Sequence, residues 1–224
     1  MDYFLERVSR AGLILLVIGA VLLGVSLRDT VTSFQEPKTF EEVLEQGAAP
    51  GDHVAGRVPY LLDIFADMQT WTENTKTHAV SGKRTTFRYY VLPAGEGYMG
   101  LAVSAKNFDT ANTLVDQTYA CLLEGGGAPT AELTADARVA VMKKELVELF
   151  RQDLREYYGY TDQDLEALGT PLMVEPRAFH TVRIFCGLGA AVFLVGALVL
   201  ILHWRKVDRR IREAVRAAQG PELD

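Results

Sequence analysis

Two long apolar runs without a single charge, one towards each end, constrain this 224-residue chain more than any other feature. Residues 11–27 form a run of 17 and residues 184–204 a run of 21. A helix needs roughly 20 residues to cross a ~30 Å hydrocarbon core. A buried helix of a soluble protein would show a polar stripe, and neither run has one. We therefore predict two transmembrane helices that flank a central domain.

The first run admits a second interpretation, a cleaved signal peptide. Arg7 and Arg10 give it a basic start, and residues 24–26 offer a small-x-small cleavage site. However, the run is longer than the apolar region of a usual signal peptide, and Asp2 and Glu6 dilute the basic start. We favour an uncleaved anchor, and under either interpretation the domain that follows is translocated.

Basic residues beside the two runs predict the orientation, because Lys and Arg near a span mark its cytoplasmic side. Arg7 and Arg10 precede the first run, and six basic residues follow the second: Arg205, Lys206, Arg209, Arg210, Arg212 and Arg216. We therefore expect a two-span protein of the bacterial cell membrane with both termini cytoplasmic and the central domain extracytoplasmic.

The middle of the chain has the pattern of a mixed α+β domain. Strand-like stretches cover residues 54–64, 85–92, 98–105 and the start of 131–141, and helical patterns cover 109–124, 142–158 and 161–168. The connector holds a short acidic helix at 39–46, and the polar stretch 70–83 is expected to be a long loop. The domain should therefore contain four or five strands and two or three helices.

These expectations divide the chain into six segments. They are a cytoplasmic N-terminus (1–10), the first transmembrane helix (11–27), a connector (28–50), the extracytoplasmic domain (51–178), the second transmembrane helix (179–204) and a basic cytoplasmic tail (205–224). The tail has an amphipathic pattern that predicts a surface helix on the inner leaflet, and the alternative is a helix that continues out of the span into water.

Residues 95–100, Gly-Glu-Gly-Tyr-Met-Gly, match the G-x-G-x-x-G pattern of dinucleotide-binding proteins. That function needs a helix directly after the glycines, so that its N-terminus faces the pyrophosphate. A strand-like stretch follows here instead. We therefore predict a hairpin turn, with residues 89–92 and 100–103 paired as antiparallel strands.

No other pattern predicts a catalytic, cofactor-binding or metal-binding residue. Asp63 and Asp67 would share a face on a helix, but their segment looks extended, which favours two solvated carboxylates. Cys121 has no His or basic neighbour that would activate its thiol. The four histidines lack a second ligand at metal-binding spacing; they are His53, His78, His180 and His203.

The two runs hold almost no polar groups, which favours anchors over the pore or substrate path of a transporter. Each run contains a small-xxx-small pair, Ala20 with Gly24 and Gly187 with Ala191, of the kind that permits close helix packing.

Four stretches carry a resemblance to a family of uncharacterised two-span bacterial membrane proteins, known only as a domain of unknown function. They are GRVPYLLDIFAD (56–67), RYYVLP (88–93), YMGLAVSAKN (98–107) and EYYGYTDQDLEALGTPLMVEP (156–176). The resemblance implies a membrane location and supplies no active-site residues. The span–domain–span order is also similar to that of mitochondrial membrane ubiquitin ligases, but the Cys/His-rich zinc module that follows their second span is absent from these 224 residues.

The leading functional hypothesis is a membrane-tethered interaction or scaffold module, and not an enzyme. The alternatives are an extracytoplasmic hydrolase with a site assembled from distant residues, and an accessory subunit of a transporter. We expect the lipid bilayer as a partner, with another envelope protein or a second copy of the chain as further candidates, and we expect no nucleic acid, cofactor or metal. A cleft with a perturbed carboxylate would favour the enzyme, whereas a free sheet edge or apolar patch would favour binding.

Overall fold

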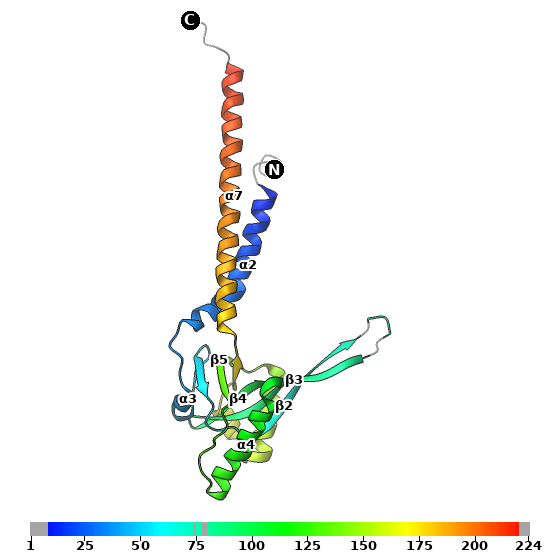
Figure 1. Cartoon of the computed structure of the whole chain (residues 1–224), viewed down its shortest axis with the longest axis vertical. Coiled ribbons are helices and arrows are strands. Elements are labelled where there is room, and N and C mark those ends of the chain that lie inside the picture. Colours follow the sequence, from blue (N-terminus) through cyan, green and yellow to red (C-terminus); the bar gives the residue numbers. More distant parts are fainter. Residues whose placement is uncertain (1–8, 74, 78–79, 220–224) are drawn as a thin grey trace. The chain divides into compact units, whose positions relative to one another are not determined.

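The computed structural model describes residues 9–73, 75–77 and 80–219, with side chains up to residue 216 (Figure 1). Two compact units emerge. One consists of the two terminal helices, α2 (Arg10–Ser33) and α7 (Phe179–Gln219), and the other is the domain of residues 34–178. Both helices are long and apolar enough to cross a membrane, and both expose most of their apolar side chains.

Helices α2 and α7 pack antiparallel, with their backbones in close contact at glycines. A Cβ atom added to Gly19 would lie 2.5 Å from the backbone nitrogen of Phe193, and one added to Gly196 would lie 2.6 Å from that of Leu16. A Cβ atom added to Gly12 or Gly189 would lie 2.9 Å from a leucine side chain of the opposite helix, Leu200 or Leu22 respectively. In each helix the two glycines are seven residues apart, which keeps them on one face.

The small pairs singled out in the sequence lie away from this contact. Cβ atoms added to Gly24 or Gly187 would meet nothing within 4 Å, and Ala20 and Ala191 are exposed. The helices therefore use a different set of glycines from the pairs that four-residue spacing suggested.

Arg183, in the first turns of α7, binds the C-terminal end of α2. Its Nε donates to the Ser33 hydroxyl at 2.9 Å, and its Nη2 donates to the Ser33 backbone carbonyl. The last carbonyl groups of a helix have no partner within it and carry partial negative charge. The arginine therefore supplies a hydrogen-bond donor to the last carbonyl group of α2. It also lies just before the second apolar run.

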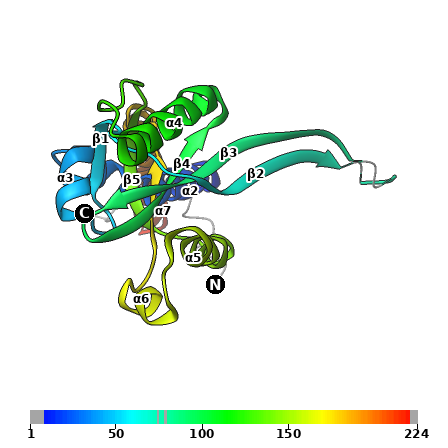
Figure 2. The ribbon, with the colours of Figure 1, turned by 90° about the horizontal axis from the view of Figure 1, so that it is seen from below.

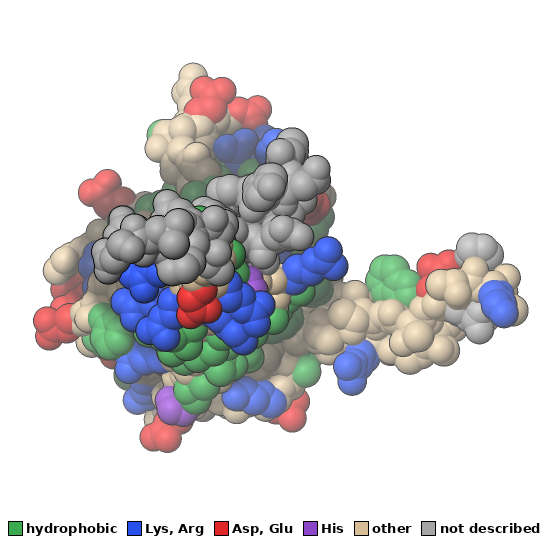
Figure 3. Space-filling model, turned by 90° about the horizontal axis from the view of Figure 1, so that it is seen from above, with side chains coloured by type: hydrophobic (Ala, Val, Ile, Leu, Met, Phe, Trp, Pro, Cys, Tyr) green, Lys and Arg blue, Asp and Glu red, His purple; other side chains and the backbone are tan. Residues whose placement is uncertain are grey.

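Helix α7 continues without a break through the basic tail. Its 41 residues would extend about 60 Å at 1.5 Å per residue, twice the hydrocarbon thickness of a bilayer. Figure 3 looks onto this end of the helix and shows Lys and Arg side chains gathered around it. The tail is therefore an extension of the second apolar helix. No Gly or Pro in residues 205–219 interrupts it.

The domain is built on a six-stranded mixed sheet, which confirms the α+β class with more strands than the sequence suggested. The strand order is β1-β5-β6-β4-β3-β2, and β4 with β6 is the parallel pair. The strands are β1 (His53–Arg57), β2 (Ile64–Glu73), β3 (Val80–Ala94), β4 (Gly97–Ser104), β5 (Thr134–Val141) and β6 (Leu172–Pro176).

Helices cover both faces of this sheet (Figure 2). On one face, α3 (Phe40–Gln46) and α4 (Phe108–Glu124) pack on the core that contains Tyr90 and Leu101. On the other face, α5 (Lys144–Tyr158) and α6 (Asp162–Ala167) pack on the core that contains Tyr89 and Val91. A short 3₁₀ turn, η1 (Ala105–Asn107), joins β4 to α4. Period-two alternation along β3 therefore supplies both cores.

The G-x-G-x-x-G segment forms the predicted hairpin. Tyr90 pairs with Leu101 and Val91 with Gly100 in an antiparallel ladder, and Ala94 with Gly97 closes it around Gly95 and Glu96. Gly95 has a φ of 56°, a left-handed conformation that glycine adopts without steric cost. Gly97 and Gly100 belong to strand β4 itself, so this segment lacks the helix N-terminus that binds a pyrophosphate.

The prediction of a long loop at residues 70–83 is wrong, because the described residues of this stretch belong mainly to strands β2 and β3. The outer part of β2 pairs only with β3, from Gln69 with Thr85 to Glu73 with Val80, whereas β4 pairs with β3 only from Phe87 onwards. The result is a two-stranded arm, residues 68–73 and 80–85, that projects beyond the helices (Figure 2). The stretch is polar overall in sequence, but its Thr and Trp residues favour strands.

The glycine contact between α2 and α7 predicts that Gly19→Leu destabilises the helix pair. Adding a side chain against the Phe193 backbone should cost about 1–3 kcal/mol, measured as unfolding of the full chain in detergent. The matched control is Gly24→Leu, which adds the same side chain to the same helix in open space and should change stability by less than about 0.5 kcal/mol. Equal effects of the two substitutions would contradict the packing.

Candidate functional site

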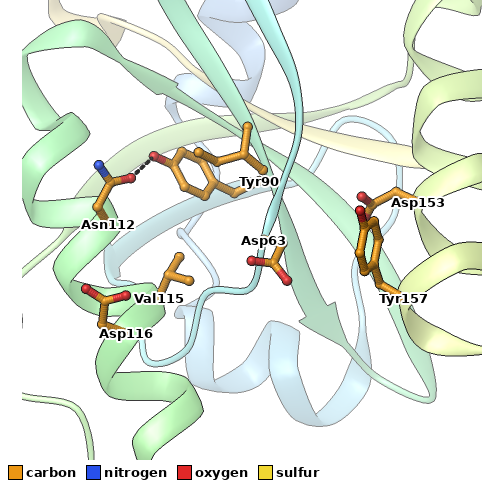
Figure 4. Close-up of a pocket in the computed structure, with 8 residues that line it drawn as sticks. Asp63, Tyr90, Asn112, Val115, Asp116, Asp153 and Tyr157 are labelled. Atoms are coloured by element: carbon orange, nitrogen blue, oxygen red, sulfur yellow. Dashed lines mark hydrogen bonds between the residues drawn. The ribbon is translucent and has the colours of Figure 1, made fainter.

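The domain has a cleft of about 400 Å³ between helices α4 and α5, at the end of the sheet where β2 begins. Figure 4 shows its polar side chains converging from three elements. Asp63 comes from the extended segment before β2, α4 supplies Asn112 and Asp116, and α5 supplies Asp153 and Tyr157. Ile64, Tyr90 and Val115 complete the lining.

The backbone of strand β3 holds Asp63 in place. Val91 donates its N–H to the Asp63 carbonyl at 2.9 Å, and Leu62 donates to the Val91 carbonyl at 2.9 Å. These two bonds continue the sheet past the start of β2, so the Asp63 side chain projects from a fixed backbone. On the other wall, the Tyr90 hydroxyl donates to Asn112 Oδ1 at 2.9 Å and orients that amide.

Tyr119 of α4 donates its hydroxyl hydrogen to Asp63 Oδ2 at 2.5 Å. Burial raises the pKa of Tyr119 to about 12, and this bond to Asp63 adds to the effect. Burial likewise raises the pKa of Tyr158, and the adjacent Tyr119 hydroxyl raises it further. Both phenols therefore keep their protons at neutral pH, and Tyr119 remains a donor to the Asp63 carboxylate.

Asp153 is the most perturbed carboxyl group of the cleft. It is only 8% exposed, and its Oδ2 atom has no hydrogen-bond partner among the described residues. Burial raises its pKa from 3.8 to about 6, with further contributions from the charges of Asp63 and Glu156. The cleft is lined by no Lys, Arg or His that could neutralise these carboxylates, as far as the described residues go.

Asp63 and Asp67, interpreted from the sequence as two solvated carboxylates on an extended segment, lie in different surroundings. Asp67 lies on β2 and pairs with Arg88 of β3 at 3.4 Å, while Asp63 faces Asp153 across the cleft. Sequence reasoning missed Asp153. One sequence signal could have identified it: Asp153 is a carboxylate within the apolar face of α5, which is formed by Leu149, Phe150, Leu154 and Tyr157.

The other residues weighed from sequence lie elsewhere. His53 is the first residue of β1 and is buried, with Nε2 2.7 Å from Asp136 Oδ1 and Nδ1 3.3 Å from the Gln35 carbonyl oxygen. His180 and His203 lie on α7, and His78 lies outside the described residues. Both Cys121 and Cys186 are free, half-buried thiols. Across the described part of the chain, no group of three His, Cys, Asp or Glu side chains is arranged to hold a metal ion.

A second surface with functional character is the arm. Its side chains are almost all exposed, including Met68 (42%), Trp71 (54%) and Val80 (57%). Lys83 and Arg84 lie beside Trp71 in a shallow depression of the same arm. Register shifts interrupt the ladder between β2 and β3 at three places, and such irregularities discourage continuous strand addition at an edge.

A family model described as a domain of unknown function, DUF8577, matches residues 3–203. The chain therefore belongs to this family, which confirms the resemblance to an uncharacterised domain. No curated protein and no solved structure matches the chain.

The raised pKa of Asp153 predicts that Asp153→Asn stabilises the protein at neutral pH. A carboxyl group with a raised folded pKa costs stability as the pH rises from 3.8 to about 6, and the full cost persists above that. At pH 7.5 the variant should gain roughly 1–3 kcal/mol, and at pH 4 the gain should largely vanish. The measurement is thermal unfolding of the full chain in detergent.

The control is Glu124→Gln on the exposed end of α4, which should change stability by less than about 0.5 kcal/mol at both pH values. A destabilised Asp153→Asn protein at pH 7.5 would show instead that the carboxylate has a stabilising partner.

Proposed function

We propose that this member of the DUF8577 family is a membrane-anchored binding module whose arm docks on another protein of the bacterial envelope. The observation that carries the proposal is the arm itself. As far as the described residues go, it consists of two strands with no third strand or helix against its outer half, and an isolated two-stranded ribbon is only marginally stable in water. A partner that covers it would stabilise the arm and bury its exposed apolar side chains.

The composition of the arm supports a protein partner. Trp71 lies beside Lys83 and Arg84, and Trp and Arg are the residue types that most often dominate the energy of protein interfaces. Met68 and Val80 add exposed apolar surface on the same arm. Residues 28–178 are acidic as a whole, with 14 Lys and Arg against 23 Asp and Glu. In the arm, Lys83 and Arg84 outnumber Glu73, so its local charge has the opposite sign.

The terminal helices support the anchoring. They are apolar over lengths that suit a bilayer, and their antiparallel packing brings the start of α2 and the end of α7 to one end of the helix pair. Basic residues flank that end, as expected for a cytoplasmic side. The central domain would then lie on the extracytoplasmic side, with the arm available to other envelope proteins.

A second candidate function, an extracytoplasmic hydrolase, is favoured by Asp153. A carboxyl group with a pKa near neutrality can donate and accept protons at physiological pH, and Asp63 would serve as the base that activates water. The described lining contains no Ser, Thr, Cys or His nucleophile. Turnover by this site would therefore fall with Asp63→Asn and Asp153→Asn alike, and Trp71→Ala would leave it unchanged.

One cross-linking experiment tests both the side of the membrane and the arm. In a Cys121→Ser, Cys186→Ser background, Thr72→Cys, an exposed position of the arm that leaves Trp71 in place, is treated in intact cells with a membrane-impermeant maleimide that carries a photoreactive group. We expect labelling, and after illumination a cross-link to a specific envelope protein. Leu123→Cys at the exposed end of α4 is the matched control, and it should be labelled without giving that cross-link.

The two outcomes that would contradict the proposal are distinct. If neither cysteine is labelled, the domain lies on the other side of the membrane. If both are labelled and Thr72→Cys gives no more cross-linking than Leu123→Cys, the arm is not a docking surface.

A further inference from the structure

We propose that the cleft between α4 and α5 binds a small aliphatic amine, with the ammonium group held between Asp63 and Asp153. The site is separate from the arm and does not depend on the function proposed for it. The inference rests on the burial of Asp153, the missing partner of its Oδ2 atom, and the lining and size of the cleft.

The first step is the charge of the cleft. Three carboxylates line it, and the described lining contains no cationic side chain. Asp153 is more than nine-tenths buried and points into the cleft (Figure 4), and its Oδ2 atom finds no donor among the described residues. Buried charged groups in proteins are normally paired. The side chain is therefore arranged for a donor that comes from outside the domain.

The second step is the chemical class of that donor. An alkylammonium group carries three N–H donors and one positive charge, which suits carboxylates that face each other from different elements. Ile64 and Val115 offer apolar contacts for a hydrocarbon chain, and Tyr90 and Tyr157 offer aromatic rings, which also attract cations. Metal ligation is a poorer fit because these carboxylates do not form a group of three at ligating positions, as judged over the described chain.

The third step is size. A cleft of about 400 Å³ falls within the range of small-molecule sites. Tyr119 fixes the Asp63 carboxylate through its hydrogen bond, and Tyr90 fixes the Asn112 amide. The polar groups that an amine would meet are therefore largely oriented before it binds.

Binding should depend on pH, because a proton on Asp153 competes with the amine. The titratable groups around Asp153 are Asp63 from the segment before β2, Asp116 and Tyr119 from α4, and Glu156, Tyr157 and Tyr158 from α5. Since the Asp153 pKa is raised to about 6, affinity should be constant above pH 7 and fall by about tenfold for each pH unit well below 6.

The test is calorimetric titration of the full chain in nanodiscs of zwitterionic lipid, which do not themselves attract amines. The probe is 1,4-diaminobutane, and the neutral control of similar shape is 1,4-butanediol. We expect saturable binding of the diamine at pH 7.5, about tenfold weaker binding at pH 5, and no binding of the diol.

Variants assign the binding to the cleft. Asp153→Asn and Asp63→Asn should each weaken diamine binding at least about tenfold, as expected for loss of a charge-assisted hydrogen bond. Asp153→Asn should also remove the pH dependence. Glu124→Gln should bind within about twofold of the unmodified chain. Circular dichroism of each variant checks that it is folded.

Three results would overturn the proposal. They are equal binding of the diol and the diamine, diamine affinity unchanged by a folded Asp153→Asn protein, and tighter binding of calcium chloride than of the diamine at the same carboxylates.

Discussion

The alternation of side chains along strand β3 is the constraint on which the rest of the domain depends. Tyr89 and Val91 face one core, and Tyr90 and Leu92 face the other, so one strand supports the helices of both layers. The same strand fixes Asp63 through the Val91 backbone. Its outer end leaves the sheet and becomes half of the arm. The cleft and the arm are thus both positioned by one element.

The helix pair depends on a different constraint, close backbone approach. Both helices are long and apolar enough to cross a membrane, and between helices in lipid the burial of apolar side chains brings no hydrophobic gain, so close packing matters more. Gly19 and Gly196 each lie against the opposite backbone, where a Cβ would collide. Arg183 then ties the start of α7 to the end of α2 through Ser33. The apolar surface that remains is exposed and suited to lipid.

Local patterns could be predicted from the sequence, and distant pairings could not. The hairpin around Gly95 and the short helix within residues 161–168 are both encoded within a few residues, and both match the structure. The arm was missed because its Thr-rich strands show no apolar alternation. The meeting of Asp63 with Asp153 joins residues about 90 positions apart, and only the carboxylate on the apolar face of α5 hinted at it.

In this fold Asp153 is buried, its Oδ2 atom has no hydrogen-bond partner among the described residues, and it lines the same cleft as Asp63. Carboxyl ¹³C NMR of aspartate-labelled full chain in nanodiscs measures this directly, with the Asp153 signal assigned by its loss in Asp153→Asn. We expect the group to titrate near pH 6, and at a lower pH in Asp63→Asn because the neighbouring charge is gone. A titration near 3.8 that Asp63→Asn does not change would contradict it.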